Sequence, residues 1–317
     1  MITHRRFGAF ALTFLVVATA ACGDDAVSER DKRVSATTTS TSTTTTVPTP
    51  IGKPSRIVSL SPTATETLFA IGAADQVVAV DSYSTYPPEA PITDLSAYEP
   101  NVEAITSYNP DLVITDGTNQ PLLDQLNTLG VATLAAPAPK TLTGAFEQIE
   151  TLGASTGNIA QAAALVVDLE AQVKGILDDF PDREGTLTYY YELDDTFFTA
   201  SSKTFIGSVL GLLGMENIAD PVDNNKSAGY PQLTPEFIVQ ANPDVIILAD
   251  TKYSLQSLET VSARPGWSEI RAVIEGNIVP LDDDIASRWG PRIVELLQQV
   301  AKAVKDITPI VDDSLSS

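Results

Sequence analysis

Two glutamates, Glu103 and Glu236, hold the same place in a pattern that the chain contains twice. In each copy the tripeptide Asn-Pro-Asp begins six residues after the glutamate and leads into an apolar run; the copies lie 133 residues apart (from 103 to 236). A repeat this long exceeds a solenoid unit and indicates two domains of one architecture, with a ligand site expected between them. The helix dipole favours a carboxylate in a first helical turn by about 0.3–1 kcal/mol, which explains both glutamates structurally. Two equivalent exposed carboxylates would also form a bipartite docking surface.

The histidine and cysteine content excludes most catalytic chemistry. His4 is the only histidine and Cys22 the only cysteine, and both precede the sequence that we expect to fold. Without histidine, neither a Ser-His-Asp or Cys-His nucleophile nor an imidazole-based zinc, copper or manganese site can form there. An enzyme would have to work with carboxylates alone, as a glycosidase does. The commonest hydrolase triads are thereby excluded, and we expect no catalytic residues, metal site or cofactor.

The N-terminal residues carry targeting signals. Residues 1–21 join Arg5 and Arg6 to fifteen apolar or small residues, a pattern typical of a signal peptide and shorter than the roughly 20 residues of a membrane span. The tetrapeptide across the end of this segment, Thr19-Ala20-Ala21-Cys22, resembles the lipobox of bacterial lipoproteins. It has Thr19 where Leu, Val or Ile is usual. The resemblance implies a lipid on Cys22, and plain secretion is the alternative.

The charge of the chain restricts its partners. The formal net charge is −22, which argues against nucleic acid and against direct binding to anionic lipid, because both are anions. A basic protein surface would attract the chain. Residues 22–54 are rich in Thr, Ser and Pro and lack the apolar side chains of a core, so we expect a disordered tether there.

Strand and helix patterns alternate in the next part of the chain, which predicts parallel α/β structure. Apolar runs typical of buried strands occur at residues 56–61, 77–80, 112–115 and 131–135. Helical patterns separate them at residues 62–71, 101–107 and 121–129. Ser61 before Pro62 is expected to cap the first helix, although Thr63 and Glu66 could form a capping box instead. The Asn-Pro-Asp sequences are expected to be turns between helix and strand.

A long helical pattern follows and then the α/β pattern restarts. Apolar residues at helical spacing over residues 158–179 predict a rod of about 33 Å, which we interpret as a spine between two lobes. Strands are then expected at residues 186–192, 245–248 and 278–281, and helices at 208–213, from 235, and at 291–304. The predicted organisation is a signal peptide at 1–21, a lipid-anchored tether at 22–54, an N-terminal lobe at 55–157, a linking helix at 158–180, a C-terminal lobe at 181–306 and a tail at 307–317.

Several motifs together resemble the substrate-binding proteins of ABC importers for cobalamin, iron-siderophores and haem. Residues 56–66 are similar to the opening of that family, and residues 83–88 to a segment of its cobalamin-binding branch. Asn101-Val-Glu103 and Leu233-Thr-Pro-Glu236 match positions whose glutamates meet arginine pockets on the permease dimer. The resemblance covers residues 56–304. It implies a class III fold: α/β, with two Rossmann-like lobes of parallel sheets joined by a single long helix.

The resemblance also implies which residues line an interlobe cleft. By position the expected ligand contacts are Tyr83, Tyr98, Tyr230, Asp284, Arg288 and Trp289. Aromatic faces suit a large, flat, partly apolar ligand such as a corrin, and Arg288 could pair with a carbonyl, carboxylate or catecholate. Ser287 departs from an acidic position of the family. Phe197 and Phe198 fall near another cleft segment but could equally belong to the core.

The function expected from the resemblance is capture and delivery without chemistry. A monomeric lipoprotein on the outer face of the cell membrane would bind a corrinoid and dock on an ABC permease dimer through Glu103 and Glu236. ATPase subunits would then drive release of the ligand. The alternatives are a ferric-siderophore or haem binding protein of the same family, an extracytoplasmic enzyme and a signalling receptor.

Overall fold

The structure is a computed structural model that describes residues 52–224 and 226–309. The predicted signal peptide, the lipidation site Cys22, most of the tether and most of the tail lie outside the described residues. Within these two ranges, no helix has the length and apolar character that crossing a membrane requires. We call the part before Gly157 the N-terminal lobe and the part after Asp179 the C-terminal lobe; the lobe boundaries expected from the sequence stay a prediction.

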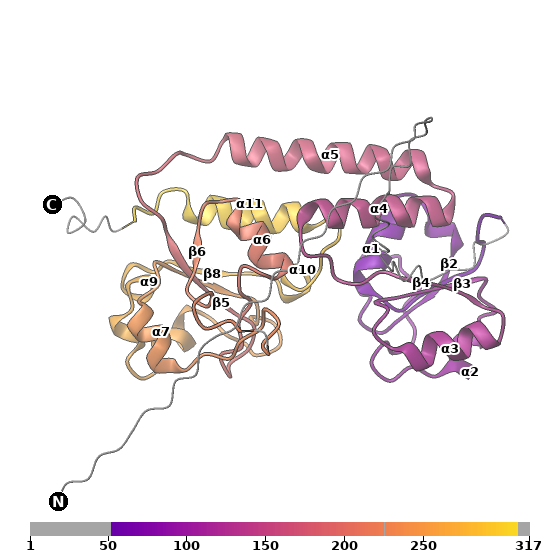
Figure 1. Ribbon diagram of the computed structural model, residues 1–317, viewed down its shortest axis with the longest axis horizontal. Coiled ribbons are helices and arrows are strands. Elements are labelled where there is room, and N and C mark those ends of the chain that lie inside the picture. Colours follow the sequence, from indigo (N-terminus) through magenta and orange to yellow (C-terminus); the bar gives the residue numbers. More distant parts are fainter. Residues whose placement is uncertain (1–51, 225, 310–317) are drawn as a thin grey trace, which may run out of the picture. The chain divides into compact units, whose positions relative to one another are not determined.

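Two parallel sheets of four strands form the frame of the described chain (Figure 1). Their strand orders, β2-β1-β3-β4 and β6-β5-β7-β8, are the same once the second sheet is counted from its own first strand. The first sheet comprises β1 Ile57–Ser59, β2 Val77–Val80, β3 Leu112–Thr115 and β4 Ala132–Ala135. The second comprises β5 Thr188–Glu192, β6 Glu216–Asn217, β7 Val245–Leu248 and β8 Ile278–Pro280. The predicted duplication is confirmed; the two-residue β6 is too short to give a sequence signal.

Helices connect the strands in both lobes. The first lobe contains α1 Pro62–Ala70, a 3₁₀ turn Ala74–Gln76, α2 Val102–Ser107, α3 Gln120–Thr128 and α4 Leu142–Thr156. The predicted linking helix is α5 Ile159–Asp178. The second lobe contains α6 Phe205–Gly211, α7 Pro235–Ala241, α8 Leu258–Ser262, a 3₁₀ turn Trp267–Glu269, α9 Arg271–Glu275, α10 Asp283–Ala286 and α11 Ile293–Val304. The short helices α8, α9 and α10 were not expected from the sequence.

Alternate residues of each strand pack on opposite sides of the sheet, because side chains alternate along a strand. In β3, Ile114 joins the core cluster that contains α4 and α5, whereas Val113 joins a separate cluster with α2 and α3. In β7, Ile247 and Ile246 divide in the same way between the α5 side and a cluster with α7 and α9. Figure 1 accordingly shows α2 and α7 on the sides of their sheets away from α5.

The core on the α5 side is continuous through both lobes. One cluster of buried residues includes Ile57 of the first sheet, Tyr189 of the second sheet, and residues of α4, α5, α6 and α11. Close-packed cores resist deformation, so lobes that share a core and a rigid helix have less freedom than lobes joined by flexible loops. We therefore expect only a small movement of the lobes when a ligand binds.

The start of α1 decides between the two caps that the sequence left open. Ser61 has extended backbone geometry and its hydroxyl accepts a hydrogen bond from Ala64 N at 3.3 Å, so it is the N-cap. The alternative capping box of Thr63 and Glu66 is wrong, because both residues lie inside the helix that Ser61 begins. Glu66 is left free to project elsewhere from α1.

The two Asn-Pro-Asp sequences form equivalent turns, as expected. Asn109 and Asn242 adopt left-handed backbone geometry, with φ of 49° and 48°, a conformation that Asn tolerates better than most residues. Asp111 accepts hydrogen bonds of 2.8 and 2.9 Å from the two backbone N–H groups just before β1. Asp244 accepts one of 2.8 Å from the first N–H of β5. Each aspartate thus satisfies the amino end of its lobe's first strand.

Candidate ligand-binding site

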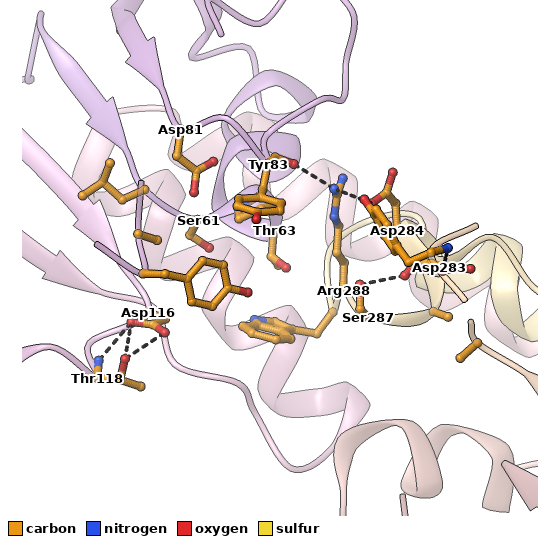
Figure 2. Close-up of a pocket in the computed structure, with 18 of the residues that line it drawn as sticks. Ser61, Thr63, Asp81, Tyr83, Asp116, Thr118, Asp283, Asp284, Ser287 and Arg288 are labelled. Atoms are coloured by element: carbon orange, nitrogen blue, oxygen red, sulfur yellow. Dashed lines mark hydrogen bonds and ion pairs between the residues drawn. The ribbon is translucent and has the colours of Figure 1, made fainter. Parts of the chain in front are cut away.

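A cavity of about 790 Å³ lies between the two lobes (Figure 2). Residues after β1, β2 and β3 line it from the N-terminal lobe, and residues after β5, β7 and β8 line it from the C-terminal lobe. These are the carboxyl ends of the strands, where open parallel α/β sheets bind ligands. The volume lies within the range of roughly 300–1,000 Å³ that is typical of small-molecule sites. The site expected between the lobes therefore has a physical cavity.

The cavity brings together most of the ligand contacts predicted from the sequence. The predicted residues that line it are Tyr83, Tyr98, Asp284, Arg288 and Trp289. Tyr230 does not line it, although its ring is about half-exposed and partial burial raises the pKa of its hydroxyl. The role of Tyr230 stays a prediction that the cavity does not support.

Aromatic side chains form part of the cavity wall, among them Tyr83, Tyr98 and Trp289. The rings of Tyr83 and Tyr98 meet edge to face, with centroids 5.4 Å apart and an interplanar angle of 82°. Their exposed fractions are 49% and 80%, so large ring surfaces are free to meet a ligand. Trp289 is partly buried, and its Nε1 donates to Gln148 Oε1 at 2.8 Å, which orients the indole. Rings held in this way suit a flat ligand.

Arg288 lines the cavity but its guanidinium is already bonded. Nη1 donates to Glu66 Oε1 at 2.6 Å, and Nη2 donates to the backbone oxygen of Tyr83 at 3.0 Å and lies 3.1 Å from Asp284 Oδ1. Only 7% of the residue is exposed. These bonds join α1 and the loop after β2 to the segment after α10. The geometry thus gives Arg288 a role in holding the lobes together, in addition to the ligand contact that the resemblance implies.

Glu66 is the centre of this interlobe cluster and was missed in the sequence. Its carboxylate is 3% exposed and accepts from Arg288 Nη1 and, at 2.9 Å, from Arg292 Nε. The Arg292 guanidinium also lies 4.1 Å from the centroid of the Tyr86 ring. Glu66 stands between two threonines in α1, which is a weak local signal, and its partners lie more than 220 residues away.

Phe197 and Phe198, for which cleft and core were equally expected, lie outside the cavity lining. Phe197 packs in the core of the C-terminal lobe against Trp267, at a centroid distance of 5.9 Å. Phe198 is 38% exposed and forms an isolated bridge to Gln232. The even choice between cleft and core is therefore decided towards the core for Phe197. Beside it, Arg264 binds the buried Glu192 through two hydrogen bonds of 2.6 Å.

Aspartates line both walls of the cavity. Figure 2 shows Asp81 and Asp116 on the N-terminal lobe and Asp283 and Asp284 on the C-terminal lobe; Asp250, after β7, also lines the cavity. Burial opposes ionisation of Asp284, but the hydrogen bond from Lys252 and the charge of Arg288 lower its pKa below the usual value. Of these five aspartates, only Asp284 was expected from the sequence. Their shared signal was a position just after a strand, or at the start of α10.

Two buried aspartates behave differently from Asp284. Burial raises the pKa of Asp81, only partly offset by hydrogen bonds from Ser84. Burial, followed by the negative charge of Glu192, raises the pKa of Asp250 from 3.8 to about 7. The cavity therefore contains a carboxyl group that titrates near neutral pH.

The two predicted docking glutamates lie at equivalent places. Glu103 is in the first turn of α2, whose N-cap is Asn101, and Glu236 is in the first turn of α7, whose N-cap is Thr234. Both side chains are exposed, and neither has an ion-pair partner within the described residues. Their carboxylates are thus available to a partner, one on each lobe.

Comparison with known proteins places the fold and the sequence in one family. A periplasmic binding protein model matches residues 57–285. Over 265 residues the chain is 34% identical to a cobalamin-binding protein of Halobacterium salinarum, covering 81% of this chain and 71% of that one. It is 28% identical to the uncharacterized ABC transporter substrate-binding lipoprotein YvrC of Bacillus subtilis, covering 93% and 95%.

Solved structures agree with this assignment. The periplasmic vitamin B12 binding protein BtuF of Vibrio cholerae aligns with a TM-score of 0.65 and 25% identity, covering 80% of this chain and 97% of that one. The periplasmic heme-binding protein RhuT from Roseiflexus sp. RS-1 aligns with a TM-score of 0.70 and 26% identity, covering 81% and 99%. The predicted two-lobed α/β fold is confirmed. The chain belongs to the periplasmic binding protein family.

Proposed function

We propose that this protein is an extracytoplasmic substrate-binding protein that captures a corrinoid in the interlobe cavity and delivers it to an ABC import permease. The observation that carries the proposal is the cavity itself, with the exposed rings of Tyr83 and Tyr98 on its wall. Flat, partly apolar ligands gain most from such rings, because each ring buries a large apolar area. The cobalamin-binding relative named above supports the choice of a corrinoid.

Binding and release need no covalent chemistry in this proposal. The folded sequence has no histidine or cysteine, so the commonest nucleophiles and their bases are absent from it. The lobes hold the ligand, and the permease with its ATPase subunits supplies the work of transport. Glu103 and Glu236 are the proposed contacts with basic pockets on the permease. A lipid on Cys22 would keep the protein at the membrane, and mass spectrometry of the purified native protein would detect it.

Haem or a ferric siderophore is the alternative ligand. One observation favours it: Tyr83 and Tyr98 present phenol groups at the cavity, and tyrosine can bind ferric iron as an axial ligand of haem. The heme-binding structural neighbour belongs to the same fold. The two candidate ligands require cavities of different charge, because haem carries carboxylates and corrinoids carry mainly carboxamides.

Isothermal titration calorimetry with cyanocobalamin, haemin and a ferric tris-catecholate would test the proposal. Cyanocobalamin should bind with a Kd in the micromolar range or below, and the Tyr83→Ala, Tyr98→Ala double variant should bind roughly 10-fold or more weakly, since each stacked ring contributes about 1 kcal/mol or more. Phe198→Ala is the matched control outside the cavity and should bind normally. Binding of haemin but not cyanocobalamin would establish the alternative.

Tyr230 allows a separate comparison in the same assay. It does not line the cavity, so the structure leads us to expect that Tyr230→Ala binds cyanocobalamin as the unaltered protein does. A loss as large as that of the Tyr83 and Tyr98 variants would restore the sequence-based assignment. It would also mean that the lobes rearrange around the ligand.

A further inference from the structure

Two aspartates of the cavity wall have carboxylate oxygens without a hydrogen-bond partner within the described residues. Asp250 is 2% exposed, and neither of its carboxylate oxygens has a partner. Asp81 is 1% exposed; Ser84 Oγ donates to its Oδ1 at 2.6 Å, but its Oδ2 has no partner. Asp81 belongs to the N-terminal lobe and Asp250 to the C-terminal lobe. Each wall of the cavity therefore contributes a buried acceptor that the protein leaves free.

The other cavity aspartates are satisfied by their own surroundings. Asp116 accepts from the N–H and the hydroxyl of Thr118 at 3.0 and 2.9 Å. Asp283 accepts from the backbone N–H groups of Lys252 and Tyr253 at 2.9 and 3.0 Å. Asp284 pairs with Lys252 at 2.6 Å. Local structure explains these three carboxylates, and it does not explain the free oxygens of the other two.

Leaving these oxygens free costs stability. A buried carboxylate without a partner loses its hydration and gains nothing in return, which is why buried polar groups are nearly always bonded. The cation whose charge acts on Asp250 is Arg264, which is already bonded to Glu192 at 2.6 Å and to Gln256 at 2.7 Å. The other charged and titratable groups facing Asp250 are Glu192, Asp283, Tyr190 and Tyr191, and none of them supplies a positive charge.

The charge of the cavity restricts the chemical class of ligand that it can bind. Five aspartates line it, and Arg288 is the one cationic side chain among its lining residues, already paired with Glu66. These carboxylates would repel a ligand with several negative charges, such as a ferric tris-catecholate, or haem with its carboxylates. A ligand whose periphery carries N–H donors and little negative charge would instead satisfy the free oxygens.

We propose that Asp81 and Asp250 are specificity-determining acceptors, one on each wall, that bind the N–H groups of a carboxamide-bearing ligand and disfavour anionic ones. The inference rests on the proposed function, because it takes the cavity as the ligand site. It deepens that proposal by naming the chemical class that the two lobes recognise: a corrinoid periphery of carboxamides, in preference to the acidic groups of haem or catecholates.

Titration calorimetry of single alanine variants with cyanocobalamin tests the inference. Asp250→Ala and Asp81→Ala should each raise the Kd roughly 10- to 100-fold, the usual effect of losing a hydrogen bond to a charged group. Asp194→Ala is the matched control, since Asp194 does not line the cavity and its carboxylate accepts hydrogen bonds from the N–H and the hydroxyl of Thr196. Its Kd should change less than about 3-fold, well under one such hydrogen bond.

Haemin binding and thermal unfolding distinguish ligand recognition by these aspartates from a purely structural role. At pH 8, above the raised pKa of Asp250, the Asp81→Asn, Asp250→Asn double variant should bind haemin more tightly than the unaltered protein, because the repelling charge is gone. Asp250→Asn should also unfold at a higher temperature at pH 8, whereas replacing a structural carboxylate would lower it. A lower unfolding temperature would overturn the inference, as would unchanged haemin binding.

The failure of this inference differs from the failure of the proposed function. If the unaltered protein binds cyanocobalamin and the Asp81 and Asp250 variants bind it equally well, the aspartates have no recognition role and the proposed function stands. If the unaltered protein binds haemin in preference to cyanocobalamin, both are overturned.

Discussion

The two lobes share one frame and differ where their strands end at the cavity. Ser59 of β1 pairs with Ile114 of β3 as Tyr191 of β5 pairs with Ile247 of β7, so the next residues, Leu60 and Glu192, are equivalent. In the first lobe this position is apolar. In the second lobe it is a buried carboxylate held by Arg264.

The polar groups around these strand ends differ in kind. The first lobe has a network of hydroxyls, in which Thr65 bonds to Ser59 and Ser84 at 2.9 and 3.0 Å and Ser84 bonds to Asp81. The second lobe has the Glu192–Arg264 pair and Asp250. At the amino ends of the strands, Asp111 and Asp244 accept hydrogen bonds from backbone N–H groups in the same way in both lobes. Architecture therefore constrains the amino ends of the strands, and the ligand site is free to differ at the carboxyl ends.

The largest effect is expected from breaking the buried ion pairs. Glu66→Ala and Glu192→Ala should each lower the free energy of unfolding by about 3–5 kcal/mol, because each leaves buried arginine charge without its partner. Urea unfolding followed by circular dichroism measures the change.

The difference between the two lobes should appear in the shape of the urea unfolding transitions of these variants. Glu66 joins the lobes, so its loss should also separate their unfolding into two steps, whereas the loss of Glu192 should destabilise the C-terminal lobe alone. The exposed pair of Lys174 and Asp178 is the control, and Asp178→Ala should change stability by no more than about 1 kcal/mol. Changes at Glu66 as small as the control would contradict its structural role.

Docking should depend on both lobes equally. The Glu103→Ala, Glu236→Ala double variant should bind ligand normally and take it up in cells roughly 10-fold or more slowly, since each lost charged contact is worth on the order of 1.5 kcal/mol or more. Each single variant should lose a similar, smaller share. Radiolabelled ligand uptake with the cognate permease measures the rate.

A charge-matched control separates docking from net charge. Glu170 and Glu295 are exposed, on α5 and α11, and changing both to alanine alters the net charge by the same amount. Uptake by this control should be normal. Equal loss in the two double variants, or normal uptake without Glu103 and Glu236, would sink the docking proposal.

A smaller, pH-dependent effect is expected at Asp250, on the C-terminal lobe's wall of the cavity. The pKa of Asp250 is raised on folding from 3.8 to about 7, so the folded state binds more protons between these values and stability falls as pH rises through that window. Asp250→Asn should remove this fall and be more stable above pH 7 by roughly 1–4 kcal/mol, but not at pH 4. Thermal unfolding at pH 4, 6 and 8 measures it; a difference independent of pH would contradict the shifted pKa.

Much of the frame was predictable because its signals are local. Short apolar runs marked seven of the eight strands, and the cap at Ser61 followed from a side chain that bonds within its own turn. The repeated glutamates lie in equivalent first turns for the same reason. The ligand site was harder to predict from the sequence. The resemblance correctly placed Tyr83, Tyr98 and Trp289 at the cavity, but it also named Tyr230, which does not line it.

By itself the sequence determined a duplicated α/β chain without folded histidine or cysteine, and two equivalent acidic helix starts. Those features depend on residue type and short-range spacing. Only the tertiary structure decided that Glu66 meets Arg288 and Arg292 across the lobes, and that Asp81 and Asp250 keep free oxygens in one cavity. The reason is physical: whether a charge is paired or left unpaired depends on burial and on partners that can lie 222 residues away, and no local pattern records either.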